Sequence, residues 1–294
     1  MHVEAMRWIK LGLVWVMAAL AWSSLGQTLN LPPRPGDALS AHAFSTLLAL
    51  QPPPPDPHRE DLIYSQIAAG NVPNWLRMLV LITTNAVIDG TTHTMSYYVT
   101  PDYFCIGSDN DYLLQPMTPM LAQRVANLLS CSLPTRKMVK DIWTHAPVKL
   151  TPAPLTPGPD MISVPVFVQE NTLIWTQRQS FLNAYPLGSL VAGDKKDIVI
   201  SALMLTNFHK SQTPVVIYGW QKTNGVPIQP LYNGHAGTWA DYSHGVRLVQ
   251  EAMTVDGEST TVSAVLTNPA LAPLLSDETN FPGNMIPRPY YLVP

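Results

Sequence analysis

The sequence predicts an α+β domain in which a mixed or antiparallel sheet with hairpins is combined with three to four helices. Strand-like segments occur in pairs around turn dipeptides, two helix-like segments follow Thr and Pro, and no repeat of fixed period is visible. Paired strands favour antiparallel hairpins, and the lack of a repeat argues against a solenoid or propeller. Helices clustered apart from strands are typical of an α+β arrangement.

Residues 1–26 have the composition of a secretory signal peptide. A weakly basic leader precedes an apolar run at 11–22, and Ser24-Leu25-Gly26 places small residues before Gln27. A signal anchor is the alternative, but a membrane-spanning helix needs roughly 20 apolar residues and this run is shorter. We therefore expect a secreted or periplasmic protein without an integral membrane segment once the signal is removed.

Residues 27–58 are expected to form a Pro-rich arm or linker. Eight prolines fall in this segment, and proline fixes φ and removes a backbone donor, so it cannot join a central sheet. Residues 59–294 are then expected to form a single elaborated α+β domain. A second proline-rich passage at 151–165 leaves a subdomain break as an alternative.

Local signals place the elements within that body. Helical spacing predicts helices over 59–69, 120–129, 135–145 and 170–183, two of them announced by Thr118-Pro119 and Pro134-Thr135. Strands at 75–88 and 92–99 flank Asp89-Gly90, and further hairpins are expected around Asn224-Gly225 and Asp256-Gly257, because these dipeptides accept positive φ. Two short strands are expected at 102–106 and 112–114.

Composition narrows the class of partner. The 17 basic and 20 acidic residues give a net charge of −3, so no basic face is available for nucleic acid. The two cysteines, Cys105 and Cys131, are an even count in an exported chain and are expected to form a disulfide or two buried thiols. A nucleophilic Cys105 is the alternative.

The segment 218–248 is the expected functional region. It holds the densest set of polar and aromatic residues, including five glycines and two of the eight histidines. His244 and His235 are the candidate acid/base groups and Asp241 the carboxylate that orients one of them, because histidine titrates nearest neutral pH. The candidate substrate-binding residues are Tyr218, Trp220, Gln221, Trp239, Tyr242, Arg247 and Lys196.

Competing interpretations remain open for several of these residues. The histidines are also consistent with packing, or with metal binding in which a third ligand comes from Asp194, Asp197, His209 or Asp241, but no metal motif is present and no metal is assigned. The charged cluster 194–197 is expected to be a solvated turn, with closure over the 218–248 segment as the alternative. The acidic run 108–111 resembles half of a calcium loop but lacks its glycine and terminal glutamate.

Residues 235–248 resemble the signature of L,D-transpeptidases, in which an upstream His is followed by Ser-His-Gly-Cys-x-Arg. Here Ser243-His244-Gly245 is followed by Val246-Arg247, so the cysteine expected after Gly245 is absent. The family's acyl-enzyme chemistry needs that thiolate. Neither its mechanism nor its fold is therefore expected here.

The leading hypothesis is an exported hydrolase or transferase that acts on an extracellular or cell-envelope polymer, peptide or glycan, through the His-containing site. The cofactor is unknown. A non-catalytic envelope protein that binds saccharide or peptide on an aromatic surface is the second hypothesis, and an envelope structural protein whose Pro-rich arm engages a partner is the third. The first requires His235 and His244 to converge, whereas the second requires exposed rings.

Overall fold

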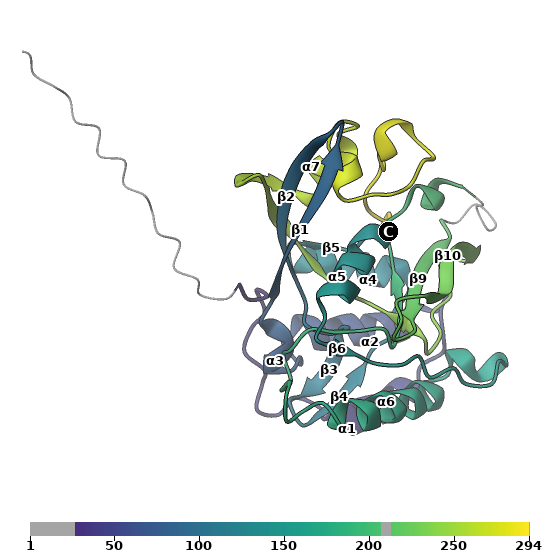
Figure 1. The fold of residues 1–294 in the computed structure, drawn as a ribbon. Helices are drawn as coiled ribbons and strands as arrows, with labels where there is room; N and C mark the ends of the chain where they lie inside the picture. The colour runs from purple at the N-terminus through teal and green to yellow at the C-terminus, as the bar shows by residue number, and fades with distance from the viewer. Residues whose placement is uncertain (1–26, 207–212, 294) are drawn as a thin grey trace, which may run out of the picture.

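The computed structural model combines several antiparallel hairpins with helices, which confirms the α+β prediction (Figure 1). It describes residues 27–206 and 213–293, so the expected signal peptide at 1–26 lies outside the described residues. In the described part, no helix has the length and apolar character needed to cross a membrane.

The larger sheet runs in the order β1-β2-β12-β13, with β5 paired to β12. Its strands are β1 (Val80–Ile88), β2 (Thr91–Val99), β5 (Cys131–Ser132), β12 (Val249–Val255) and β13 (Glu258–Thr261). Asp89 and Gly90 join β1 to β2, and Asp256 and Gly257 join β12 to β13, all four with positive φ. Both hairpins are thus confirmed, since aspartate and glycine tolerate this left-handed region.

The second sheet runs in the order β10-β9-β8-β11. Its strands are β8 (Lys196–Ile198), β9 (Val215–Gln221), β10 (Pro227–His235) and β11 (His244–Gly245). The β9–β10 hairpin turns at Gly225, as expected, whereas β8 and β11 pair in parallel. Two small pairs complete the strands: β3 (Cys105–Ser108) with β4 (Asp111–Leu114), and β6 (Val148–Lys149) with β7 (Val191–Ala192).

The described residues contain seven α-helices, more than the three to four expected. They are α1 (Ala41–Ala49), α2 (Pro57–Ala68), α3 (Asn74–Arg77), α4 (Pro119–Leu128), α5 (Arg136–His145), α6 (Val164–Gln179) and α7 (Val262–Thr267). Thr118 and Thr135 cap α4 and α5 through their hydroxyls, as their sequence signals predict. Of the three additional helices, α1 falls in the short apolar segment 41–50 between the prolines, where a helix was possible. The other two, α3 and α7, are too short to show a periodic signal.

Residues 27–58 pack against the rest of the chain. Phe44 and Leu48 of α1 are fully buried, and α1 lies beside β4 and α6 at the lower end of the molecule in Figure 1. Leu29 donates its backbone N–H to the carbonyl of Arg77 at 2.9 Å. Prolines in this segment therefore exclude it from the sheets without separating it from the core.

The proline-rich passage 151–165 also contacts the body. The backbone N–H of Leu155 donates to the hydroxyl of Tyr242 at 2.8 Å, and the backbone N–H of Tyr242 donates to the carbonyl of Met161 at 3.0 Å. The passage then leads through a 3-10 turn, Pro159–Ile162, into α6. It thereby contacts Tyr242, one of the candidate residues.

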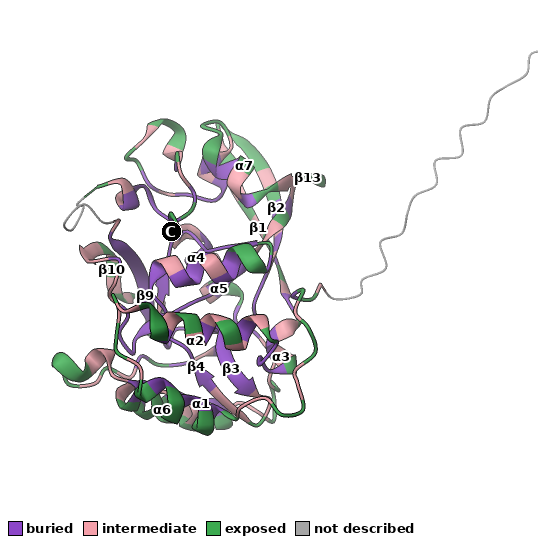
Figure 2. Cartoon of the chain, turned by 180° about the vertical axis from the view of Figure 1, so that it is seen from behind, coloured by how far each residue is buried: buried purple, intermediate pink, exposed green. Residues whose placement is uncertain are grey.

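One stretch of chain connects the two sheets. After β11 in the second sheet, the backbone of Val246 accepts from Phe104 and that of Leu248 accepts from Thr100, and the chain then enters β12 of the first sheet. Figure 2 shows β9 buried along its length, while the outer faces of α1 and α6 are largely exposed. The candidate residues on β9 and β11 are thus buried in the interior, whereas Lys196 on β8 is half-buried.

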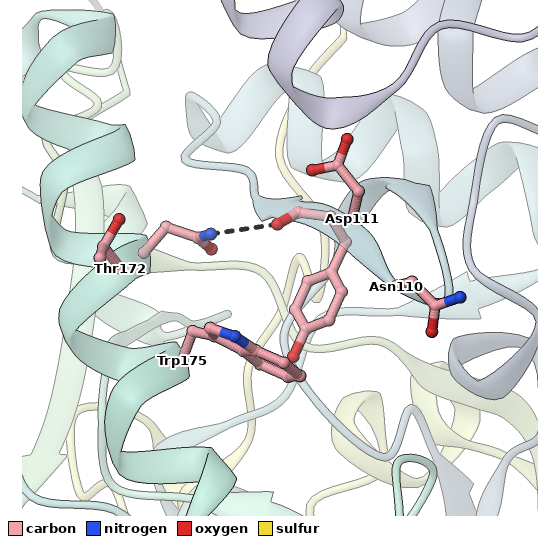
Figure 3. Close-up of a pocket in the computed structure, with 6 residues that line it drawn as sticks. Asn110, Asp111, Thr172 and Trp175 are labelled. Carbon is pink, nitrogen blue, oxygen red and sulfur yellow. Dashed lines mark hydrogen bonds between the residues drawn. The ribbon is translucent and has the colours of Figure 1, made fainter.

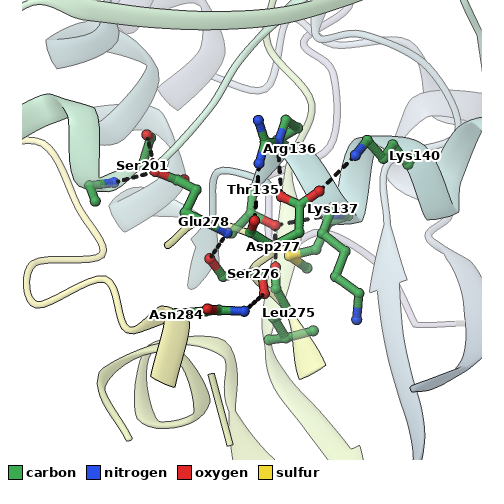
Figure 4. A network of polar contacts seen from close by, with 12 residues as sticks. Thr135, Arg136, Lys137, Lys140, Ser201, Leu275, Ser276, Asp277, Glu278 and Asn284 are labelled. Carbon is green, nitrogen blue, oxygen red and sulfur yellow. Dashed lines mark hydrogen bonds and ion pairs between the residues drawn. The ribbon is translucent and has the colours of Figure 1, made fainter. Parts of the chain in front are cut away.

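The C-terminal segment is attached to α5 by a polar network (Figure 4). Asp277 accepts from Arg136 at 2.8 Å and from Lys140 at 2.6 Å, and Thr135 donates to the carbonyl of Leu275. Glu278 accepts from Ser201 at 2.8 Å. These contacts attach residues 275–278 to α5 and to Ser201, which follows β8.

Candidate functional site

The parallel pair of β8 and β11 brings His244 beside Lys196. Lys196 donates its backbone N–H to the carbonyl of Ser243 at 2.8 Å, which sets the register. A Cβ on Gly245 would lie 2.5 Å from the ring of Tyr103 and 2.7 Å from the side chain of Lys195. Only glycine permits this close approach, so it determines how deeply His244 is placed.

His244 and Asp241 form the centre of the site. His244 is 0% exposed and Asp241 2% exposed, and Nε2 of the imidazole lies 3.8 Å from Oδ2 of the carboxylate. Among the described residues, neither ring nitrogen of His244 has a hydrogen-bond partner. A buried polar atom without a partner costs about 1–3 kcal/mol, so this arrangement is unfavourable for folding alone.

The two groups have different charge states at neutral pH. Burial lowers the pKa of His244 to about 4, so its ring is neutral at pH 7. Burial alone would raise the pKa of Asp241, but neighbouring cations and hydrogen bonds hold it well below its usual range. His244 lowers the pKa of Asp241 only while its ring is protonated, so at pH 7 the charge of Lys196 and the hydrogen bonds from Ser243 and Trp239 keep Asp241 ionised.

The side chain of Asp241 accepts three hydrogen bonds from described residues. Ser243 donates from its backbone N–H at 2.9 Å and from its hydroxyl at 2.5 Å, and the indole N–H of Trp239 donates at 3.0 Å. The carboxylate is therefore held rigidly, pointing one oxygen toward the imidazole. Such an ionised carboxylate beside a neutral imidazole can orient the ring and stabilise a proton taken up by it.

Aromatic rings connect this buried pair to the surface. The ring of His235 stacks on Trp239 with centroids 5.1 Å apart and planes 16° apart. Tyr232 meets His235 edge-on at 5.3 Å and is 42% exposed. Trp239 and His235 are half-buried, so the sequence Tyr232, His235, Trp239, Asp241 runs from solvent to the interior.

Trp220 lies beside Lys196, and its backbone conformation is strained. Its φ is 56° inside strand β9, an outlier for a bulky residue, and its neighbour Gly219 also has positive φ. The indole N–H of Trp220 donates to the carbonyl of Asp194 at 2.8 Å, and Nζ of Lys196 lies 4.7 Å from the centre of its ring. Tyr242 packs edge-on against the same ring.

The charged cluster 194–197 is not a solvated turn, and that expectation is wrong. Asp194, Lys195 and Asp197 are all buried. Lys195 forms an ion pair with Glu170 of α6 and donates to the carbonyl of Tyr242 at 2.6 Å. Burial raises the pKa of Glu170 to about 7 despite the charge of Lys195.

The two aspartates of this cluster also have perturbed acidities. Asp197 accepts from the hydroxyl of Tyr103 at 2.9 Å, and burial raises its pKa to about 7. Burial and the repulsion of Asp102 raise the pKa of Asp194 to about 8. A group of carboxyls with raised pKa in and around β8 is typical of functional sites, although structural ion pairs produce it as well.

Several predicted residues lie away from this centre. Arg247 is buried and donates to the carbonyls of Thr100 and Val191, so its hydrogen-bonding capacity is directed to the backbone. Tyr218 lies on the side of β9 that faces α5, with Lys140 5.9 Å from its ring. Gln221 is buried at the end of β9.

The structure thus brings together His235, Trp239, Asp241, Tyr242, His244, Lys196 and Trp220. Trp220, Tyr242 and Tyr218 are buried, so these three rings do not form an exposed row.

Two neighbours of the site were not predicted from the sequence, Glu170 and Lys195. Glu170 falls on the buried stripe of α6 with Phe167, Ile174 and Arg178, a spacing of three or four residues. That pattern of a charged residue on an apolar stripe indicates a buried ion pair. For Lys195 the signal was the apolar sequence on both sides of the charged cluster.

The contacts of the two cysteines and of the acidic turn 108–111 are those of structural residues. Cys105 and Cys131 are free, buried thiols, and burial raises the pKa of Cys131 to about 12 and that of Cys105 well above its usual value. In the acidic turn, Asp109 accepts from the backbone of Asn74 at 2.6 Å. Among the residues described, no three His, Cys, Asp or Glu side chains are grouped so that they could hold a metal ion.

Comparisons with protein-family models, with curated proteins and with solved structures find no match for this chain.

Proposed function

We propose that this protein is an exported hydrolase or transferase that acts on an extracellular or cell-envelope polymer, with His244 and Asp241 as its acid/base pair. The observation that carries the proposal is the imidazole of His244. It is neutral, it lies 3.8 Å from an ionised carboxylate, and neither of its nitrogens is hydrogen-bonded to a described residue. If His244 served only for packing, an apolar side chain of similar size could replace it without loss of stability.

In this proposal the outer residues meet the substrate. His235 and Trp239 provide a half-buried stack against which a ring or peptide plane can lie, and the ammonium of Lys196 can pair with an anionic group. Asp241 links the stack to His244 because it bonds to Trp239. A proton accepted by His244 would be stabilised by Asp241, whose negative charge increases the basicity of the ring.

The test compares two histidines with opposite surroundings. His244→Leu removes the imidazole whose nitrogens lack partners, and it should leave the free energy of unfolding unchanged within about 1 kcal/mol, or raise it. Activity should fall by about 10²- to 10⁴-fold. His145→Leu is the matched control, because His145 contacts two backbone carbonyls at 2.7 and 3.0 Å. It should lose stability and keep activity.

Activity is measured on peptidoglycan sacculi, chitin and casein, as released reducing ends for glycosidic cleavage and released amines for amide cleavage. Wild-type protein that yields neither product from any of the three, or a fully active His244→Leu variant, would refute the proposal. Export is tested separately: intact-mass measurement of the secreted protein should give a chain that begins at Gln27.

A non-catalytic binding protein is the second candidate, and the stack of Tyr232, His235 and Trp239 favours it. These rings are partly exposed, whereas His244 beneath them is completely covered. Retention of the protein on one of the same polymers, lost in Trp239→Ala but kept in His244→Leu, would support binding without catalysis.

A further inference from the structure

A small polar cavity lies between the β3–β4 hairpin and α6, apart from the residues of the His244 site. It has a volume of about 160 Å³ and is lined by Asn110, Asp111, Tyr112, Asn171, Thr172 and Trp175. Figure 3 shows Thr172 and Trp175 projecting from α6 on one side, with Asn110 and Asp111 on the hairpin opposite. A cavity of about 150 Å³ is large enough for a six-membered ring such as benzene.

Three aromatic rings in contact with one another link the two walls of this cavity. Tyr112 meets Trp75 edge-on with centroids 5.0 Å apart and meets Trp175 edge-on at 5.6 Å. Trp175 is only half-buried, so part of its ring faces the cavity. An indole held in this way offers a rigid apolar surface at little cost in side-chain entropy.

The spacing between the two walls is also fixed. Asn171 accepts from the backbone of Leu114 at 2.9 Å and donates to the carbonyl of Tyr112 at 3.0 Å, which ties α6 to β4. The cavity is therefore preformed, and a ligand would not have to order it.

The polar groups around the rings have unused capacity. Within the described residues, the side chain of Asn110 makes no hydrogen bond, and the carboxylate of Asp111 accepts only one, from the backbone N–H of His42 at 3.4 Å. The hydroxyl of Thr172 donates to Val168 and can still accept. Amide, carboxylate and hydroxyl groups next to an indole match the hydroxyls and apolar face of a sugar.

We infer that this cavity binds one pyranose ring of a neutral or N-acetylated glycan. The carboxylate of Asp111 accepts from sugar hydroxyls and repels an acidic sugar, so uronic acids should be excluded. The inference stands on the cavity alone. If the proposed function also holds, a sugar in this cavity identifies the polymer as a glycan rather than a peptide. The reason is that α6 carries both a wall of the cavity and Glu170, which pairs with Lys195 near the His244 site.

Binding to the full-length secreted protein is measured by calorimetry with chitotriose, cellotriose and trigalacturonate. We expect one or both neutral sugars to bind and trigalacturonate not to bind. Trp175→Ala should weaken binding at least about tenfold, Trp175→Phe should largely preserve it, and Asn110→Ala should weaken it by about twofold to tenfold. Trp143→Ala, at another half-buried tryptophan, is the matched control and should bind like the wild type.

The inference would be overturned if neither chitotriose nor cellotriose binds up to about 10 mM. So would unchanged binding in both Trp175→Ala and Asn110→Ala, and if Trp175→Ala does not fold, Asn110→Ala with Trp175→Phe decides. The two proposals fail separately. His244→Leu should bind these sugars like the wild type, so lost activity with intact binding concerns only His244, and intact activity without sugar binding concerns only the cavity.

Discussion

Replacing Asp194 by asparagine should remove a large part of the pH dependence of stability. Asp194 is 0% exposed, and no described residue donates a hydrogen bond to either oxygen of its side chain. Burial is the main reason that its pKa rises from 3.8 to about 8, and repulsion by the nearby Asp102 adds to the rise. The carboxyl is therefore protonated in the folded protein at pH 7.

The sign and size of the effect follow from this shift. Between about pH 4 and pH 8 the folded chain keeps a proton on Asp194 that the unfolded chain has released, so stability falls as pH rises. The contribution is complete below the unfolded pKa and is lost as pH passes the folded pKa. A shift of about four units at about 1.4 kcal/mol each gives a loss on the order of 5 kcal/mol by pH 9.

The assay is urea unfolding of wild type and Asp194→Asn at pH 5, 7 and 9. The other perturbed groups, Glu170, Asp197 and His244, titrate in both proteins and largely cancel in the difference. The variant should resemble the wild type at pH 5 and become the more stable protein by pH 9. Asp160→Asn, at an exposed position, should show no such trend. If the free energy of unfolding varies with pH in the same way in wild type and Asp194→Asn, the carboxyl of Asp194 is not protonated in the folded protein at pH 7.

Three further predictions concern packing, ion pairs and thiols. Gly245→Ala should destabilise the fold by about 1–3 kcal/mol in thermal unfolding because its Cβ has no room, whereas Gly36→Ala, with no atom within 4 Å, should change stability by less than about 0.5 kcal/mol. Asp277→Asn loses two partly exposed ion pairs and should cost about 1 kcal/mol at low salt and less at about 1 M salt; equal losses at both would contradict an ionic origin. Cys105 and Cys131 should react with a chromogenic disulfide reagent only in urea, and rapid reaction of the native protein would show that a thiol is accessible.

Hairpins and capped helices were predictable because their signals are local. Asp89-Gly90 and Asp256-Gly257 adopt the positive φ that their turns require, and Thr118 and Thr135 cap helices within three residues of themselves. The parallel pairing of β8 with β11 has no such signal. Each strand is two or three residues long, too short for an alternating pattern, and the partner lies in a distant part of the chain.

The difference between local signals and contacts from distant segments also decides which site residues could be predicted from the sequence. His244, Asp241 and Trp239 lie within six residues of one another, and their glycine-bounded loop could be recognised from the sequence. Their depth could not, because burial of His244 depends on Gly245 packing against Tyr103, far away in sequence. A loop dense in polar groups is usually solvated, and tertiary contacts reverse that expectation here.

The buried charge of Glu170 shows why the other member of an ion pair cannot be identified from one segment of the sequence alone. Glu170 occupies the apolar stripe of α6, and an ionised carboxylate in that position is strongly unfavourable unless a cation is supplied from elsewhere. The helix sequence therefore implies that a cation exists, but Lys195 and Lys196 are equally charged neighbours. The pairing of β8 with β11 gives the two lysines different surroundings. Lys195 contacts Glu170 and Tyr242, whereas Lys196 lies against the ring of Trp220 and near Asp241. Lys195 is thus used for the fold, and Lys196 is the cation that remains available to the site.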